Sequence, residues 1–425
     1  MHFAVITRVL GMLLMIFSLT MLTPIFVGWM FDEKTASTFL SAFSITLIVG
    51  MAFYLPSRNS AGELRTRDGF IVTVFFWLVL STFGALPLML AEALQLSFMD
   101  ALFESVSGLT TTGATVISGL DDLPKSILYY RQQLQWLGGI GIVVIAVAIL
   151  PMLGVGGMQI YRAETPGPVK DSKLTPRITE TANVLFRIYL ALTAACALAY
   201  WAAGMSGFDA IGHSFSTVAI GGFSTHDASM GFFDSGLIMS ICIFFMIISG
   251  LNFALHYMVW HNRRLSFYWQ DPEARMYLYL LFIGIVITCL YLYYSGTYNW
   301  NDSISQGTFQ LVSIMTTTGF ATTEFNAWPT FLPFFLLFLS FFGACAGSTG
   351  GGIKIGRMLI LGKQGIREIY RLVHPNAILP IKLNNRQIPE RITDAIWAFV
   401  GVYLAIFYLM VLLLLASGLD YVTAW

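Results

Sequence analysis

The stretch Thr110-Thr111-Thr112-Gly113-Ala114-Thr115 decides the fold of this chain, because versions of it occur three times. The other copies are Ala219-Ile220-Gly221-Gly222-Phe223-Ser224-Thr225 and Thr316-Thr317-Thr318-Gly319-Phe320-Ala321-Thr322, at intervals of roughly 100 residues. Each copy follows a semi-polar stretch, such as residues 100–109 or 307–315, that is too short to span a bilayer. We therefore predict three short pore helices that enter the membrane, each followed by a loop that turns back.

A loop at membrane depth is tolerated only where protein buries it or where it lines a water-filled cavity. Glycine adopts the left-handed torsions that turn successive carbonyl oxygens toward one axis, and rings of carbonyl oxygens replace the hydration shell of a monovalent cation. The C-terminal end of each short helix carries a partial negative charge that also favours a cation. One copy alone is equally compatible with an ordinary loop or helix cap, but three copies favour a cation pore.

The composition places most of the 425 residues in lipid, since 56% are hydrophobic and only 11% are charged. Apolar runs long enough for a spanning helix occur at residues 9–30, 37–55, 69–93, 127–152, 184–204, 233–259, 275–295 and 393–417, and an interrupted run covers residues 330–361. We therefore predict nine crossings. The first run lacks a cleavage site, so it is predicted to be a retained helix with a cytoplasmic N-terminus.

The net charge of zero conceals a polarised molecule. Threading the chain with re-entrant loops after the third, fifth and seventh helices puts every lysine and arginine except Lys34, Lys125 and Arg131 on the cytoplasmic side. This asymmetry is the positive-inside pattern and supports the topology independently of hydropathy. Asp100 and Glu104 open the first pore helix, where carboxylates suit the positive end of the helix dipole and are expected to draw cations to the outer mouth.

Two further motifs carry a family resemblance. Together with the three repeated phrases, Trp136-Leu137-Gly138-Gly139-Ile140-Gly141 and Gly343-Ala344-Cys345-Ala346-Gly347-Ser348-Thr349-Gly350-Gly351-Gly352-Ile353-Lys354 closely resemble the TrkH/KtrB superfamily of potassium transporters, and the two helices before the first repeat resemble its TrkH branch. The resemblance implies an all-α polytopic membrane protein with pseudo-fourfold helix, pore-loop, helix repeats around a central pore. It also implies a homodimer, a cytosolic nucleotide-binding regulatory ring of the Trk or Ktr type, and a place in the cell inner membrane.

The resemblance assigns potassium-binding residues to the three loops. It implies filter glycines at Gly113, Gly222 and Gly319. The residues before them would supply backbone carbonyl ligands, namely Thr111, Thr112, Ile220, Gly221, Thr317 and Thr318. In plant members of the superfamily a serine at the first filter glycine accompanies sodium permeation, so Gly113 implies a preference for potassium. Potassium at these residues is the substrate, and no cofactor is expected in this chain.

The same pattern divides the chain into five predicted segments. Residues 1–67 would form the two extra helices, and residues 68–182, 183–271 and 272–391 the first, second and third pore repeats. Residues 392–425 would begin a fourth repeat, with a helix at 393–417 but no fourth pore loop. A filter built from these residues alone is expected to lack one wall.

The interrupted run at residues 330–361 contains Gly343, Gly347, Gly350, Gly351 and Gly352. Each glycine costs a helix interior about 1 kcal/mol relative to alanine, so five of them predict a loop at membrane depth. The resemblance implies an intramembrane gate below the filter, and the alternative is a close-packed contact between helices. A phosphate-binding loop is excluded, because Ile353 stands where that motif needs glycine before lysine.

Other classes of function fit the sequence less well. An intramembrane protease would need a Ser-His pair, paired aspartates or a His-Glu-x-x-His motif inside the spans, and the sequence has none there. A sodium- or proton-coupled symporter stays open as the alternative, although such coupling usually leaves ionisable residues at mid-membrane. Cys196, Cys242, Cys289 and Cys345 stand alone in apolar runs and are expected to pack between helices. The bilayer is the expected environment, and no nucleic-acid partner is expected.

Overall fold

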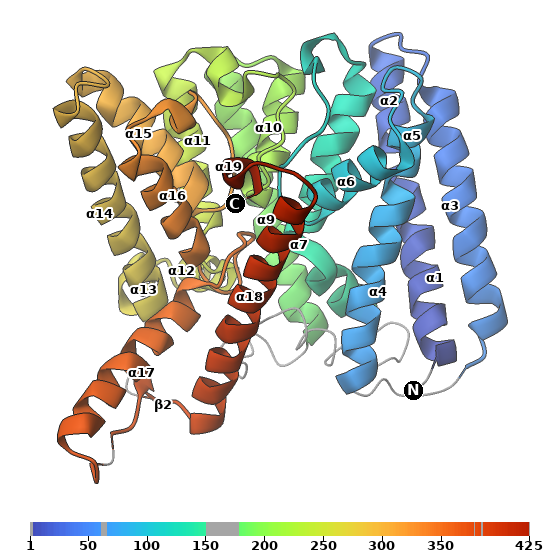
Figure 1. Ribbon diagram of the computed structural model, residues 1–425. Helices are drawn as coiled ribbons and strands as arrows, with labels where there is room; N and C mark the ends of the chain where they lie inside the picture. The colour runs from blue at the N-terminus through green and yellow to red at the C-terminus, as the bar shows by residue number, and fades with distance from the viewer. Residues whose placement is uncertain (1–2, 61–65, 150–177, 378, 384–385, 425) are drawn as a thin grey trace.

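The computed structural model describes residues 3–60, 66–149, 178–377, 379–383 and 386–424, and most of them are helical (Figure 1). The first part of the chain forms α1 (Phe3–Thr20), α2 (Thr23–Met30), α3 (Ala36–Ser57), α4 (Thr66–Gly84), α5 (Leu86–Leu90), α6 (Phe98–Leu109) and α7 (Lys125–Ile149). The middle part forms α9 (Ile178–Ala202), α10 (Gly207–Ala219), α11 (Gly236–Ser249), α12 (Phe253–Asn262) and α13 (Ser266–Gln270).

The last part forms α14 (Pro272–Tyr294), α15 (Trp300–Met315), α16 (Phe331–Phe342), α17 (Ile355–Val373), α18 (Glu390–Ala416) and α19 (Tyr421–Ala424). A small antiparallel pair joins α17 to α18. Its strands are β1 (Lys382–Leu383) and β2 (Arg386–Gln387), with Lys382 opposite Gln387. Figure 1 shows α17 and the start of α18 extending beyond the main helical body, on the side where the N-terminus lies.

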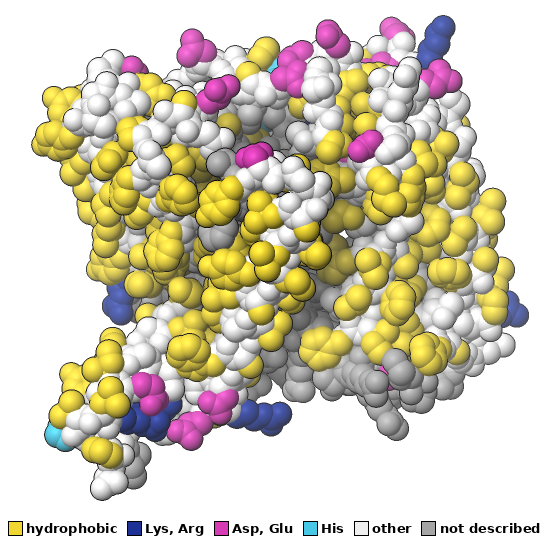
Figure 2. Space-filling model, viewed as in Figure 1, with side chains coloured by type: hydrophobic (Ala, Val, Ile, Leu, Met, Phe, Trp, Pro, Cys, Tyr) yellow, Lys and Arg dark blue, Asp and Glu magenta, His cyan; other side chains and the backbone are white. Residues whose placement is uncertain are grey.

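Long apolar helices confirm the all-helical membrane fold. Within the described residues six helical segments are long and apolar enough to cross a bilayer: Phe3–Met30, Ala36–Ser57, Phe70–Leu90, Asn183–Ala202, Pro272–Tyr294 and Glu390–Ala416. Their outward side chains stay hydrophobic, and Figure 2 shows these side chains covering the middle of the molecule while acidic groups gather along the upper rim. The four cysteines are all buried with free thiols, as expected.

Two predicted crossings are not straight helices. The run 233–259 divides into α11 and α12, which are bent by 95°. The bend has a local cause, because Asn252 caps α12 by accepting a hydrogen bond from the amide of Ala254 at 2.8 Å. The run 127–152 corresponds to α7, which is kinked at Gly141 (φ 54°), and residues 150–152 lie outside the described part of the chain.

The interrupted run 330–361 contains a loop, as predicted. Helix α16 ends at Phe342, a non-helical segment follows, and α17 starts at Ile355 and continues to Val373, well beyond the apolar run. Gly343 leaves the helix with φ 64° and ψ −152°. A side chain there would overlap the carbonyl oxygen of Gly351, so the loop can fold back on itself only with glycine at this position.

Helix α7 packs against the C-terminal ends of two pore helices, and its glycine pair makes this possible. A Cβ at Gly138 would overlap the backbone carbonyl of Leu109, the last residue of α6. A Cβ at Gly139 would lie 2.7 Å from the Cβ of Ala219, the last residue of α10. The Gly138-Gly139 pair therefore sets the position of the first two pore helices relative to each other.

We predict that Gly138→Ala lowers the free energy of unfolding by about 1–3 kcal/mol, the usual cost of adding a methyl group where there is no room. The obstructing atom belongs to the Leu109 backbone and cannot rotate away. The measurement is the midpoint of thermal unfolding of the purified protein in detergent. Gly362→Ala in α17 is the control, because among the described residues nothing lies within 4 Å of the added methyl group. Equal midpoints for the two variants would contradict this account of the packing.

Candidate functional site

The three pore helices start with the same cap. In each helix the side chain at the N-cap position accepts a hydrogen bond from the backbone amide of an aspartate three residues later. The same side chain donates a hydrogen bond to the carboxylate of that aspartate. The pairs are Ser97 with Asp100 (3.2 and 2.7 Å), Ser206 with Asp209 (3.1 and 2.7 Å) and Asn299 with Asp302 (2.9 and 2.8 Å). This is a variant of the capping box. The caps and the acidic residues at the positive ends of the dipoles stabilise three helices that are too short to be stable alone.

The three pore helices also end in the same way. One or two residues after the end of each helix, one residue has left-handed backbone torsions: Thr111 (φ 54°), Ile220 (φ 55°) and Thr317 (φ 68°). Each is followed two residues later by a left-handed glycine: Gly113 (φ 80°), Gly222 (φ 83°) and Gly319 (φ 85°). The chain therefore makes three copies of one turn, and we call them the filter turns.

Each filter turn is fixed by two hydrogen bonds to the helix before it. In the first copy the amide of Thr111 donates to Gly108 at 3.0 Å and the amide of Thr112 to Ser107 at 2.8 Å. The other copies repeat this pattern within 0.1 Å: Ile220 to Thr217 and Gly221 to Ser216, then Thr317 to Ile314 and Thr318 to Ser313. This is the Schellman arrangement, which normally places glycine where these turns have threonine or isoleucine. A β-branched residue with φ > 0 is a conformational outlier of the kind concentrated at functional sites.

The filter turns lie edge to edge in chain order. A Cβ at Gly113 would overlap the carbonyl oxygen of Gly221, and a Cβ at Gly222 would overlap the carbonyl oxygen of Thr318. At Gly319 nothing among the described residues lies within 4 Å of the same position. The first glycine thus contacts the second turn, and the second glycine contacts the third.

Polar side chains from the pore helices brace the backbone beyond each filter turn. Each of these residues lies four positions after the aspartate of the cap. Its side chain forms a hydrogen bond with a hydroxyl group in the segment that follows the filter turn, which we call the outgoing strand. The pairs are Glu104 with Thr115 (3.0 Å), His213 with Ser224 (2.9 Å) and Gln306 with Thr322 (2.5 Å). Sequence reasoning missed this repeat because the three bracing residues differ in type. Alignment of the copies on Asp100, Asp209 and Asp302 would have revealed it.

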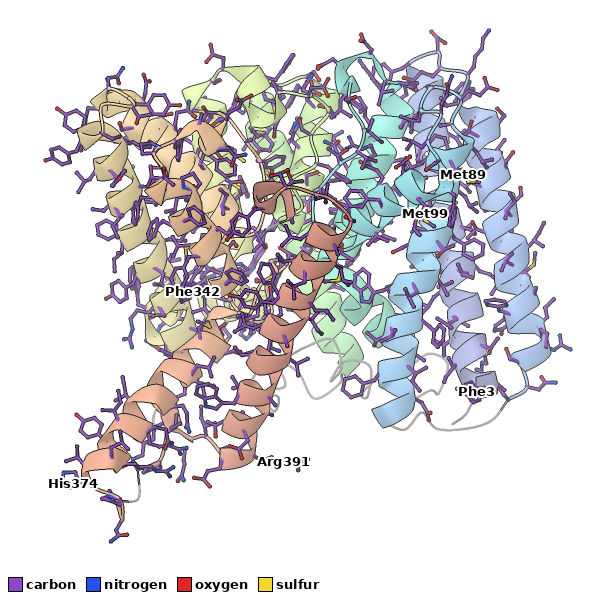
Figure 3. All side chains as sticks on the ribbon, viewed as in Figure 1. Phe3, Met89, Met99, Phe342, His374 and Arg391 are labelled. Atoms are coloured by element: carbon purple, nitrogen blue, oxygen red, sulfur yellow. The ribbon has the colours of Figure 1, made fainter. Side chains whose placement is uncertain are left out.

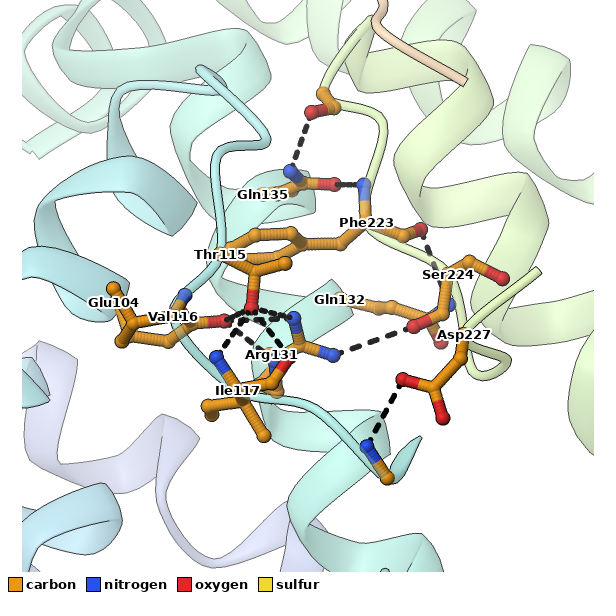
Figure 4. A network of polar contacts seen from close by, with 12 residues as sticks. Glu104, Thr115, Val116, Ile117, Arg131, Gln132, Gln135, Phe223, Ser224 and Asp227 are labelled. Atoms are coloured by element: carbon orange, nitrogen blue, oxygen red, sulfur yellow. Dashed lines mark hydrogen bonds and ion pairs between the residues drawn. The ribbon is translucent and has the colours of Figure 1, made fainter. Parts of the chain in front are cut away.

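A buried ion pair stands behind the first two filter turns (Figure 4). The Arg131 Nε atom lies 2.7 Å from Glu104 Oε1, and both side chains are at most 1% exposed. The guanidinium group also donates to the Thr115 hydroxyl at 3.0 Å and to the Ser224 carbonyl at 3.3 Å, so it joins the first outgoing strand to the second. The expectation that Glu104 draws cations to the outer mouth is therefore wrong, because this carboxylate is buried against Arg131.

The Gln135 amide clamps the second filter turn from behind. Its nitrogen donates to the Gly221 carbonyl at 2.6 Å, and its oxygen accepts from the Phe223 amide at 3.0 Å (Figure 4). The Gly221 oxygen therefore has one lone pair engaged by protein. Loss of either partner in such a buried contact leaves unsatisfied polar groups, which costs about 1–3 kcal/mol.

The glycine-rich loop between α16 and α17 contacts the inner side of the filter turns. The Gly351 amide donates to the Thr317 hydroxyl at 2.7 Å, and the Thr349 hydroxyl donates to the Val218 carbonyl at 2.8 Å. On its other side the Cys345 amide donates to the Gly250 carbonyl at 2.9 Å, at the bend between α11 and α12. The loop is therefore attached both to the filter turns and to the broken span.

Comparison with known proteins identifies the family. Residues 35–424 match the family described as TrkH, a cation transport protein. This chain belongs to the TrkH family. It is 55% identical to the Trk system potassium uptake protein TrkH of Halomonas elongata, a match that covers 100% of this chain and 88% of that protein. It is 53% identical to the protein of the same name from Escherichia coli K12, covering 99% of this chain and 87% of the relative.

A solved member of the TrkH family has the same fold. The crystal structure of the potassium transporter TrkH from Vibrio parahaemolyticus superposes with a TM-score of 0.90 at 48% identity, covering 100% of this chain and 88% of that one. A more distant relative, the Trk system potassium uptake protein TrkG of Escherichia coli K12, is 41% identical over 100% of this chain. The resemblance drawn from the repeated motifs is thus confirmed, and the chain is a multi-pass membrane transporter rather than an enzyme.

In this TrkH-family chain the loops beyond the first two filter turns are tied together by charged groups. The His226 ring contacts the Asp121 carboxylate through Nδ1, and its Nε2 atom lies 3.5 Å from Asp209. The neighbouring Asp227 carboxylate accepts from the amides of Gly119 and Leu120, both at 3.0 Å. Burial acts to lower the pKa of His226, but the nearby carboxylates of Asp209 and Asp121 outweigh it and raise the pKa above the ordinary 6.5. The hydrogen bond from His226 lowers the pKa of Asp121.

We predict that this clamp stabilises the protein in a defined pH range. A raised histidine pKa gives a contribution that is fully present below the unfolded value near 6.5 and is lost as pH rises through the folded value. The midpoint of thermal unfolding should therefore fall between pH 6 and alkaline pH, and His226→Gln should flatten this dependence. His261→Gln, at an exposed position on α12, is the control. A His226→Gln variant with the pH dependence of the parent protein would show that the clamp contributes nothing.

Proposed function

We propose that this chain takes up potassium across the cytoplasmic membrane through a channel-like selectivity filter. The observation that carries the proposal is the set of three filter turns, which share their torsions, their hydrogen bonds and their edge-to-edge contacts. The names of the relatives, which are Trk system potassium uptake proteins, support potassium as the substrate.

The backbone, rather than side chains, is the proposed ligand. Ile220 occupies the position equivalent to Thr111 and Thr317, and it has no side-chain oxygen. The group common to all three copies is therefore the carbonyl oxygen. We propose that potassium is bound at the residues of the three filter turns: Thr111, Thr112, Gly113, Ile220, Gly221, Gly222, Thr317, Thr318 and Gly319. The C-terminal dipole ends of α6, α10 and α15 add a negative potential there.

A sodium- or proton-coupled symporter is the second candidate. Proton coupling needs a titratable group on the ion path, and residues 110–115, 219–223 and 316–322 contain no ionisable side chain. This argues against proton coupling at the filter turns, and sodium coupling stays the alternative to channel-like conduction.

The glycine-rich loop is the proposed gate. Gly343, Gly347, Gly350, Gly351 and Gly352 leave the loop with few side chains. Its contacts with Thr317 and Val218 attach it to the third filter turn and to the C-terminal end of α10. We further propose that the chain forms a homodimer, lies in the inner membrane with its N-terminus in the cytoplasm, and is regulated by a cytosolic nucleotide-binding ring. The projecting helix α17, with basic residues such as Lys363 and Arg371, lies on the side where such a ring would bind.

We predict that Gly113→Ser and Gly222→Ser each reduce the potassium over sodium permeability ratio by roughly tenfold, equivalent to about 1.4 kcal/mol of discrimination. Both residues have φ > 0, and any side chain would push against the carbonyl oxygen of the next filter turn. The measurement is the ratio of ion fluxes into proteoliposomes. Gly207→Ser, at the start of α10 with no described atom within 4 Å of the added group, is the control. Unchanged ratios in both filter variants would refute the filter assignment.

We predict that deletion of residues 347–352 raises potassium flux and leaves the potassium over sodium ratio unchanged. A gate opposes conduction only by occupying the path, so its removal opens the path without altering the filter. Flux and ratio are measured in the same proteoliposomes, after gel filtration has shown that the variant is monodisperse. A well-folded variant that conducts less than the parent would favour the alternative, in which the loop is a packing contact between helices.

A further inference from the structure

Glu273 is the second residue of α14, where an acidic side chain suits the positive end of the helix dipole, but it does not cap that helix. The cap of α14 is Asp271, whose carboxylate accepts from the Ala274 amide at 2.8 Å. The Glu273 side chain instead turns toward the glycine-rich loop. Its Oε1 atom accepts hydrogen bonds from the Ala346 amide at 2.6 Å and from the Gly356 amide at 2.8 Å.

These two amides belong to different structural elements. Ala346 lies in the first half of the glycine-rich loop, and Gly356 is the second residue of α17. One carboxylate oxygen therefore joins α14, the loop and α17. A larger residue than glycine at position 356 would obstruct this contact, because a Cβ there would lie only 2.9 Å from Oε1 and 3.0 Å from the carboxyl carbon of Glu273.

Glu273 also supplies what the start of α17 lacks. The residue in the N-cap position is Lys354, which provides no side-chain cap and has φ 78°, an outlier for a lysine. The first amides of a helix need acceptors, and a lysine at the positive end of the dipole is unfavourable. The Lys354 side chain turns back to the Gly350 carbonyl inside the loop. The carboxylate of Glu273 thus caps α17 from a neighbouring helix.

The opposite side of the loop bonds to the filter. Because the Gly351 amide donates to the Thr317 hydroxyl, a path of hydrogen bonds and loop backbone runs from α17 through Glu273 to the third filter turn. At the α14 end of this path two amides donate to one carboxyl oxygen, at 2.6 and 2.8 Å.

We propose that Glu273 is a positioning residue that holds the glycine-rich loop in its closed place and couples it to α17. If α17 moves relative to α14, either the hydrogen bond between Gly356 and Glu273 breaks or the Glu273 side chain moves with α17. Because the loop is bonded to the same oxygen atom, the loop is affected in both cases. The proposal rests on the proposed role of the loop as the gate. It adds that Glu273 transmits a displacement of α17 to that gate.

The test compares Glu273→Ala, Glu273→Gln and the control Asp271→Asn, two residues away on the same helix. In proteoliposomes without any regulatory partner, Glu273→Ala should raise potassium flux several-fold with an unchanged potassium over sodium ratio. Glu273→Gln should give a smaller increase, because an amide oxygen still accepts hydrogen bonds but more weakly. Asp271→Asn should match the parent. A second readout is the rate at which a thiol reagent labels Ser348→Cys, which should rise when combined with Glu273→Gln.

The outcomes separate this proposal from the gate on which it rests. If deletion of residues 347–352 raises flux but monodisperse Glu273→Ala does not, the coupling is wrong and the gate stands. If the deletion itself leaves flux unchanged, the gate fails. If Glu273→Ala does not fold, the test uses Glu273→Gln alone and Glu273→Gln combined with Ser348→Cys. Unchanged potassium flux in the first and an unchanged labelling rate in the second would overturn the proposal.

Discussion

The whole site depends on one backbone constraint, the left-handed residue that ends each pore helix. Threonine or isoleucine is held in a conformation that glycine normally adopts, and a left-handed glycine follows two residues later. Such a conformation persists only where the surroundings over-determine it. Here these are the Schellman hydrogen bonds, the braces from Glu104, His213 and Gln306, and the Gln135 clamp. Because Gly113 and Gly222 each stand against the carbonyl of the next turn, the second turn is held by the first and the third by the second.

The sequence predicted the repeated pore helices and missed most of the side-chain contacts that hold them. Three phrases with glycine at the same place were enough to predict three pore helices and their turns, since glycine readily adopts the left-handed torsions found at Gly113, Gly222 and Gly319. The role expected for Glu104 was wrong for a physical reason. Hydropathy and the positive-inside rule assign charges by their position along the chain, and they do not register two opposite charges that pair inside the protein.

The bend in the run 233–259 was missed for a similar reason. Its residues are apolar enough for a straight span, and only the capping geometry of Asn252 reveals that a new helix starts there. The division into repeats at residues 67, 182, 271 and 391 and the assignment of potassium-binding residues stay predictions. The interrupted helix was predictable because five glycines within ten residues oppose a helix whatever surrounds them.

Two levels of control are built into the same set of contacts. The filter turns are braced from behind by α7, and they are contacted from the inner side by a loop that Glu273 attaches to α14 and α17. In the proposed mechanism selectivity and gating share the residue Thr317, whose backbone belongs to the third filter turn and whose hydroxyl accepts from the loop.

The central claim is that backbone carbonyl oxygens of the filter turns bind the permeating ion. It is tested most directly by anomalous diffraction from crystals of the protein containing rubidium or thallium in place of potassium. The account predicts an anomalous peak between the filter turns, bordered by carbonyl oxygens from residues 111–113, 220–222 and 317–319. A structure with ordered filter turns and no peak between them, but with peaks at acidic side chains of the outer loops, would contradict it.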